Sequence, residues 1–113
     1  MDCLFCKIAQ GAIPATIHYE DTQIVAFADI YPKAPVHLLI IPRRHIATLN
    51  DLTPADVPLV GQMVQVATQL AKKLGLSDKG YRIVNNCNEE GGQTVFHIHC
   101  HLLGGRQMTW PPG

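Results

Sequence analysis

Three histidines alternate with apolar residues near the end of the chain, in the order His97-Ile98-His99-Cys100-His101. Because successive side chains of a β-strand point to opposite faces, a strand here would place the histidines on one side and the apolar residues on the other. Imidazole changes its charge near neutral pH, and it can act as a nucleophile or transfer a proton. The pattern therefore predicts a reacting site; the alternative is a histidine-rich strand on a solvated face.

A polar segment with two glycines, residues 86–95 (NCNEEGGQTV), comes just before these histidines. A Gly-Gly pair allows backbone N–H groups to approach a ligand closely, as they do in phosphate-binding loops. The same pair also makes ordinary turns. Residues 86–95 are therefore a candidate phosphate loop beside the histidines.

A C-x-x-C motif, Cys3 and Cys6, lies at the other end of the chain without a second pair of the same kind. In a reducing compartment such a motif binds metal more often than it forms a structural disulfide. Thioredoxin-like redox chemistry is the competing interpretation, although no thioredoxin-type pattern surrounds the motif. We interpret Cys87 as a loop thiol and Cys100 as a core residue.

Composition limits the class of protein. The chain has 113 residues, of which 47% are hydrophobic, and this fits one domain, 1–113, with a real core. Lys plus Arg and Asp plus Glu both number 9, which argues against a nucleic-acid surface because such surfaces carry excess basic charge. No signal peptide and no apolar run of the ~20 residues needed to span a membrane are visible, so we expect a cytoplasmic protein that binds no membrane.

Short elements must position the candidate residues. Apolar alternation and breaker residues predict strands at 17–20, 23–28, 37–41, 81–85 and 95–103, a short helix at 2–10 and a loop at 29–35. A long helix is predicted from Thr53, as N-cap, to a C-terminal cap at Gly75, with Asp56 completing a capping box and Met63 in the core. Antiparallel strands covered by one long helix predict an α+β fold.

The run of His-apolar-His-apolar-His-apolar-apolar resembles the signature of the histidine triad (HIT) superfamily. Further segments are similar to its Hint branch, the histidine triad nucleotide-binding proteins: 27–30 (FADI), 34–37 (APVH), 41–45 (IPRRH), 91–94 (GGQT) and 103–113 (LGGRQMTWPPG). The match covers essentially the whole chain. It implies a five-stranded antiparallel sheet with one long helix and a short N-terminal helix, paired into a ten-stranded sheet in a homodimer.

The resemblance also implies an activity, the hydrolysis of purine nucleoside phosphoramidates with AMP-like or GMP-like nucleotide parts. His99 would attack the α-phosphorus and form a nucleotidyl-histidine intermediate. His101 would hydrogen-bond the phosphate or the departing group, and His37 would belong to the same polar relay. Asn86, Thr94 and the backbone N–H of Val95 would hold phosphate oxygens, Asp29 would bind the ribose hydroxyls, and the purine slot would comprise Leu4, Phe5, Ile8, Phe27 and Ile30.

Several of these residues have a plainer interpretation when they are considered without the resemblance. Asp29 precedes a loop that contains prolines and reads equally well as a turn residue. Phe27 and Ile30 also fit plain core positions. His37 begins an apolar strand, where a satisfied core histidine is the default interpretation.

A structural zinc site is a further implication of the resemblance. It would be built from Cys3, Cys6, His45 and His97, which together form a set of two cysteines and two histidines. His97 would then support the catalytic strand and take no part in the chemistry.

Two other functions stay open: a nucleotide-binding or scaffold protein with incidental catalysis, and a dinucleoside polyphosphate hydrolase. The intact pair of His99 and His101 favours an enzyme. The apolar tail around Trp110 favours the Hint branch, and we expect this tail to lie near the active site of a partner subunit.

Overall fold

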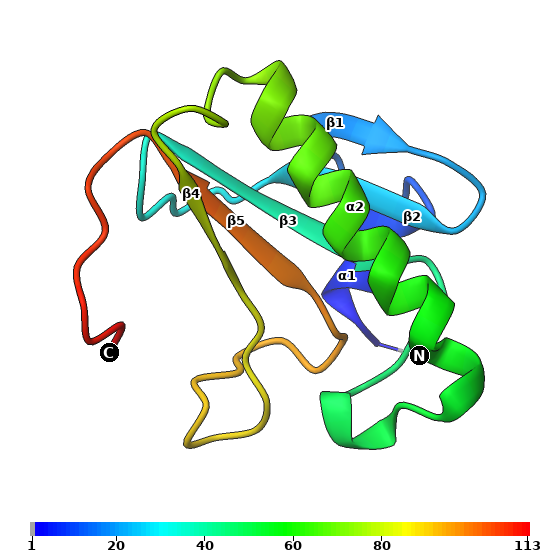
Figure 1. Ribbon diagram of the computed structural model, residues 1–113. Coiled ribbons are helices and arrows are strands. Elements are labelled where there is room, and N and C mark those ends of the chain that lie inside the picture. The colour runs from blue at the N-terminus through cyan, green and yellow to red at the C-terminus, as the bar shows by residue number, and fades with distance from the viewer. Residues whose placement is uncertain (1) are drawn as a thin grey trace.

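The computed structural model describes residues 2–113 and contains one antiparallel sheet of five strands in the order β1-β2-β3-β5-β4 (Figure 1). The strands are β1 (Ile17–Glu20), β2 (Ile24–Ala28), β3 (Val36–Pro42), β4 (Tyr81–Val84) and β5 (Cys100–Gly104). The helices are α1 (Leu4–Ala9), α2 (Val57–Lys73) and two 3-10 turns, Leu49–Asp51 and Pro54–Asp56. The predicted α+β architecture is confirmed.

Strand alternation gives the sheet two different faces. On one face Ile24, Ile40 and Leu102 pack under α2, which lies across the sheet in Figure 1. On the other face Phe27 and Ile41 pack with residues of α1. Burial on both faces explains why β2, and β3 after His37, are continuously apolar. The candidate pocket described below lies on the face that α1 covers.

The predicted capping box of the long helix forms, because Asp56 accepts hydrogen bonds from the backbone N–H and the hydroxyl of Thr53. The α-helix itself begins later than predicted, at Val57, after a 3-10 turn. Pro58 has no N–H to close an α-turn on the Pro54 carbonyl, so the N–H of Val57 bonds that carbonyl instead. At the other end Gly75 has a φ of 77°, as expected of a C-terminal cap.

The strand predicted at 95–103 is wrong in its first half. The chain bends at residues 95–97, and the sheet ladder begins only at Cys100. Before that point the N–H of Ile98 bonds the Ile46 carbonyl at 2.8 Å, a contact outside the sheet. The three histidines therefore do not form a single row on one strand, and His97 turns away from the other two. The remaining predicted elements differ from those observed by a few residues at their ends.

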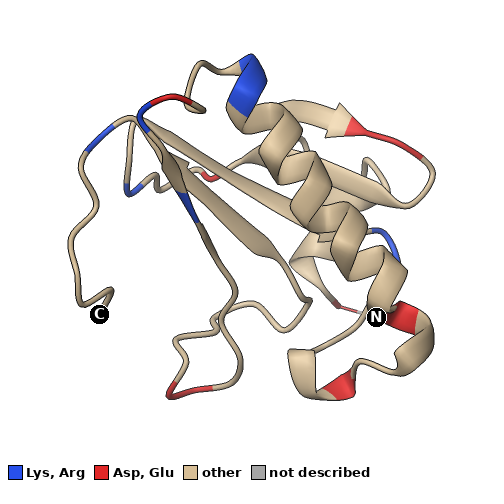
Figure 2. Ribbon diagram, in the orientation of Figure 1, with Lys and Arg blue, Asp and Glu red and all other residues tan. Residues whose placement is uncertain are grey.

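Charged residues are dispersed over loops and the ends of elements, and neither sign forms a continuous patch on the ribbon (Figure 2). Within residues 2–113, no helix has the length and apolar character that crossing a bilayer requires.

Candidate active site and cysteine–histidine cluster

A cavity of about 500 Å³ opens on the α1 face of the sheet. Apolar side chains line one part of it, and the polar groups of Asp29, His37, His99 and His101 line another. Asp29 directly follows β2, His37 lies on β3, His99 directly precedes β5, and His101 lies on β5. Because β3 and β5 are adjacent and antiparallel, Leu39 pairs with His101, and this register brings the two histidine-bearing strands together.

Hydrogen bonds fix the tautomers of His37 and His101. The backbone N–H of Lys33 donates to His37 Nδ1 at 3.0 Å, so a neutral His37 carries its proton on Nε2. His37 Nε2 lies 2.9 Å from His101 Nδ1 and donates to it. His101 Nδ1 is thus an acceptor, and the proton of a neutral His101 is on Nε2. The pair therefore presents an N–H donor from His101 Nε2.

His99 carries its proton on the other ring nitrogen. Its Nδ1 lies 2.7 Å from the His97 carbonyl oxygen, which can only accept, so the proton is on Nδ1 and the lone pair is on Nε2. The ring centroids of His99 and His101 are 4.9 Å apart. Phe5 packs edge-on against His99 with centroids 5.1 Å apart. One imidazole with a free lone pair thus lies beside one with an N–H donor.

Burial keeps these imidazoles neutral. It lowers the pKa of His37 and of His99 below the usual value of 6.5. Burial, with the neighbouring His99 and His37, lowers the pKa of His101 to about 4. At neutral pH the tautomers described above are therefore the relevant forms.

Asp29 is part of the cavity lining. Its Oδ1 accepts the N–H of Tyr31 at 2.8 Å, and its Oδ2 is 3.4 Å from His37 Nε2. It is thus both a turn residue and a cavity residue, so the two interpretations of Asp29 are compatible. Asp29, His37 and His101 are also close enough to surround a cation. The Lys33 N–H argues against that use, because it occupies Nδ1 and leaves His37 Nε2 protonated.

The apolar wall contains every residue expected in the purine slot. Phe5 and Phe27 are buried and meet edge to face, with centroids 5.4 Å apart. Ile30, in contrast, is 81% exposed at the rim, so it is not a core residue. Leu4 and Ile8 complete this part of the lining.

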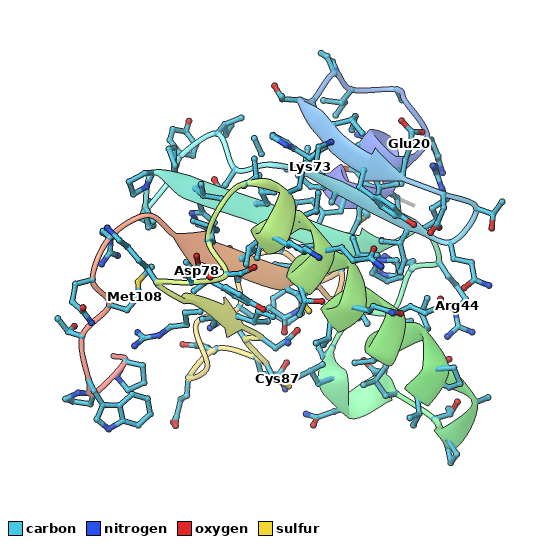
Figure 3. The ribbon with its side chains drawn as sticks, turned by 45° about the horizontal axis from the view of Figure 1, so that its top comes forward. Glu20, Arg44, Lys73, Asp78, Cys87 and Met108 are labelled. Atoms are coloured by element: carbon cyan, nitrogen blue, oxygen red, sulfur yellow. The ribbon has the colours of Figure 1, made fainter. Side chains whose placement is uncertain are left out.

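The candidate phosphate loop contributes Thr94 and Val95 to the cavity lining. Asn86, which was expected to hold phosphate, is not part of that lining. Its side-chain Nδ2 donates to the Gly91 carbonyl at 2.6 Å, so in this structure it shapes the loop. Cys87 lies in the same loop (Figure 3) and is half-buried.

Sequence reasoning missed part of the lining: Ile13, Pro14, Ala15, Ala28, Tyr31, Lys33 and Leu39. Lys33 gave no signal because it acts through its backbone N–H, which every residue except proline has. Pro14 was considered only as a breaker after the N-terminal helix, yet the short apolar segment 13–15, a few residues beyond the end of α1 at Ala9, could have been assigned to the slot.

Four residues from three distant segments meet in a second cluster: Cys3, Cys6, His45 and His97. His97 Nδ1 lies 3.4 Å from Cys3 Sγ, 3.5 Å from Cys6 Sγ and 3.3 Å from His45 Nδ1. For tetrahedral zinc with Zn–S near 2.3 Å and Zn–N near 2.05 Å, the edges are about 3.5 Å for S–N and about 3.3 Å for N–N. The side chains present therefore fit a tetrahedral metal ion.

The protonation of His97 agrees with this fit. Its Nε2 donates to the Pro42 carbonyl at 2.7 Å, which leaves the Nδ1 lone pair facing the two sulfur atoms. Burial lowers the pKa of His97, so the ring is neutral, as a metal ligand must be. Cys3 is also the N-cap of α1, since its Sγ accepts the Cys6 N–H at 3.4 Å. This cap holds the C-x-x-C motif in place.

Comparisons with known proteins show to which family the chain belongs. The family model described as the C-terminal binding region of the scavenger mRNA decapping enzyme matches residues 2–110. An uncharacterized HIT-like protein of Synechocystis is 47% identical over 112 residues, which are 99% of this chain and 97% of the relative. The chain belongs to the histidine triad (HIT) family.

Solved structures of HIT proteins share the fold over nearly the whole chain. A HIT family hydrolase from Legionella pneumophila superposes with a TM-score of 0.98 at 62% identity, covering 99% of this chain and 100% of the other. A histidine triad protein from Clostridium difficile gives 0.94 at 42% identity, with 96% and 95% covered. A histidine triad nucleotide-binding protein from Candida albicans gives 0.82 at 33% identity, with 97% and 83% covered.

Proposed function

We propose that this HIT protein hydrolyses purine nucleoside phosphoramidates through a nucleotidyl intermediate on His99. The observation that carries the proposal is the opposed protonation of two adjacent imidazoles. His99 has a free lone pair on Nε2, and His101 has a hydrogen-bond donor on Nε2. A nucleophile beside a donor suits attack on a phosphorus whose oxygens gain charge in the transition state.

The reaction has two displacements. In the first, the His99 Nε2 lone pair forms a bond to the α-phosphorus while the bond from phosphorus to the amine nitrogen breaks. The departing nitrogen takes one proton from solvent and leaves as the neutral amine. In the second, water attacks the same phosphorus and gives one proton to solvent while the bond from phosphorus to His99 Nε2 breaks. This step releases the nucleoside monophosphate and returns the electron pair to His99.

His101 is assigned the role of a fixed donor to the phosphate or the departing group. A proton wire through His37 does not fit the geometry. If His37 gave up its Nε2 proton it could not replace it at Nδ1, because the Lys33 N–H already points at that atom. His37 is therefore assigned the orientation of His101, and the neutral donor is available over a broad pH range.

The remaining lining supports a nucleotide as ligand. Phe5 and Phe27 offer apolar lining for a purine, and Asp29 offers an acceptor for ribose hydroxyls in the same cavity. Thr94 and Val95 line the same cavity as His99, which supports the roles proposed for the Thr94 side chain and the Val95 N–H in holding phosphate oxygens. A neighbour in the comparison is itself named a nucleotide-binding protein.

We also propose that the metal at Cys3, Cys6, His45 and His97 is zinc. Four protein ligands leave no open position, so the ion would cross-link segments of the chain and would not activate a substrate. In this arrangement the His97 carbonyl orients His99 while the His97 ring is anchored at the cluster.

The protein is further proposed to be a homodimer in which two five-stranded sheets join through their edges. The supporting observations are apolar side chains left exposed in the single chain. Val57 and Val64 on α2 are 66% and 38% exposed, and Trp110 in the tail is 83% exposed. The free edge of β4 and the exposed apolar side chains of α2 both favour association with a second copy of the chain.

The experiment that tests the activity is turnover of AMP and GMP amidates beside a diadenosine polyphosphate. We expect the amidates to be cleaved fastest, with loss of the reaction in His99→Asn. Faster cleavage of the diadenosine polyphosphate would assign the protein to that class of hydrolases. Nucleotide binding without turnover of any of them would indicate a binding or scaffold protein.

A further inference from the structure

One buried side chain, that of Gln93, ties together the loop between β4 and β5. Only 6% of Gln93 is exposed. Its Oε1 accepts the Asn88 N–H at 2.8 Å, and its own backbone N–H donates to the Asn88 carbonyl at 3.0 Å. Asn88 has a φ of 60°, in the left-handed region that non-glycine residues seldom occupy. The two bonds to Gln93 help to hold that backbone in place.

The amide nitrogen of the same side chain also bonds a residue outside the loop. Gln93 Nε2 donates to the Val95 carbonyl at 3.1 Å and to the Ala47 carbonyl at 2.8 Å. Ala47 follows His45 by two residues, and its neighbour Ile46 accepts the Ile98 N–H. The Gln93 side chain therefore connects the candidate phosphate loop to the segment that carries a ligand of the cysteine–histidine cluster.

We propose that Gln93 is a positioning residue that couples the phosphate loop to the metal cluster. Its carboxamide fixes the backbone at Val95. In the proposed function the Val95 N–H faces the phosphate, and this part of the inference rests on that function. Through Ala47 it also fixes the segment of His45. A metal held by the cluster and a phosphate held by the loop then stabilise each other's sites.

The hydrogen-bonding groups of glutamine explain why another residue type would not serve. The site uses one acceptor and both amide hydrogens, which together only an amide side chain supplies. Glutamate keeps the acceptor for Asn88 but sets a carboxylate oxygen against two carbonyl oxygens. Methionine keeps the volume but leaves three buried polar groups without their partner.

The test compares Gln93→Met and Gln93→Glu with the control Gln23→Met, which makes the same change at an exposed glutamine between β1 and β2. Amide hydrogen exchange is the first measurement. In Gln93→Met we expect the Asn88 and Ile98 amides to exchange at least about tenfold faster, with amides in the middle of α2 unchanged. In Gln93→Glu, which keeps the acceptor for Asn88, we expect this increase for the Ile98 amide. Wild-type exchange of the Ile98 amide in either variant would overturn the proposal.

The second measurement separates positioning from a general loss of stability. We expect the ratio of AMP affinity to adenosine affinity to fall about tenfold in Gln93→Met, because only AMP uses the phosphate loop. Binding of AMP should slow the loss of bound zinc to a chelator in the wild type about fivefold or more, and this effect should vanish in Gln93→Met. A variant that keeps both effects would overturn the coupling.

The outcomes also separate this inference from the proposed function. If the wild type binds neither AMP nor an amidate, the proposed function fails, whereas the exchange rates of Asn88 and Ile98 still decide the role of Gln93. If the wild type binds AMP and the Gln93 variants behave like the control, the function stands and the inference fails.

Discussion

Replacing His37 by alanine removes the residue that orients His101 while leaving His99 and His101 in place. The change deletes the 3.0 Å bond from the Lys33 N–H and the 2.9 Å bond to His101 Nδ1. A buried polar group left without a partner costs about 1–3 kcal/mol. Since the cavity is open to water, we expect the low end, about 2 kcal/mol in the free energy of unfolding for the two groups together.

The effect of His37→Ala on catalysis follows from the same bonds. Without its partner His101 is no longer held in the tautomer that carries the proton on Nε2. A loss of about 1.4–2 kcal/mol of transition-state stabilisation corresponds to a ~10–30-fold fall in kcat/KM. Burial and the neighbouring histidines lower the pKa of His101 to about 4. Removing His37 admits water and removes one of those neighbours, so the acid limb of the pH profile should move to higher pH.

The assay is steady-state hydrolysis of an AMP amidate between about pH 4 and 8, with unfolding by urea measured on the same samples. His18→Ala, on β1 away from the cavity, is the matched control. A folded His37→Ala protein whose kcat/KM stays within about twofold of wild type would refute the orienting role. A shift of the acid limb to lower pH would refute the account of the His101 pKa.

Three further predictions follow from the cluster, the buried imidazoles and the tail. Replacing Cys3 and Cys6 by serine should abolish the binding of about one zinc per chain, measured by metal analysis, and lower the unfolding temperature; metal-free wild type of unchanged stability would contradict this. Because the folded pKa of His101 lies below its unfolded value of 6.5, the unfolded chain binds the extra proton first. The free energy of unfolding should therefore have its full value above pH 6.5 and fall as the pH drops from about 6.5 to about 4, with a shallower fall in His101→Gln. An equal dependence on pH in wild type and His101→Gln would contradict this prediction. Deleting residues 106–113 should change the preference among amidates more than the affinity for AMP, and light scattering should show a dimer of the full chain; a monomer at micromolar concentration would contradict the dimer.

Much of the fold could be predicted because local signals agreed with each other. Thr53 and Asp56 marked the start of the long helix, Gly75 marked its end, and apolar runs marked β2 and β3. The 3-10 turn at the helix start could be predicted only from Pro58. Because Pro58 has no N–H, the Pro54 carbonyl has no α-helical partner and accepts the Val57 N–H instead.

The bend before β5 could not be predicted from alternation. The period-two pattern continues through His97, but the backbone there bonds the segment after β3, far away in the sequence. A tertiary contact thus replaced the local preference for a strand. The bend also affects the site, because it separates His97 in the cluster from His99 in the cavity.

Apart from Asn86, the candidate site was foreseen where side chains carry the chemistry, and it was missed where the backbone or a structural amide does. His99, His101 and Asp29 were chosen for their side chains, and all line the cavity. The Lys33 N–H and the Gln93 carboxamide act through hydrogen bonds that cannot be predicted from the residue type. Their positions emerge only after the loops are folded.

The nucleotidyl-histidine intermediate is the central claim, and rapid quenching tests it most directly. The protein would be mixed with excess AMP amidate, quenched within the first turnover and digested for peptide mass spectrometry. We predict a nucleotidyl adduct on the peptide that contains His99, absent in His99→Asn, whose turnover falls by ~10³-fold or more. Single-turnover cleavage by His99→Asn at near the wild-type rate, or an adduct on a different residue, would contradict it.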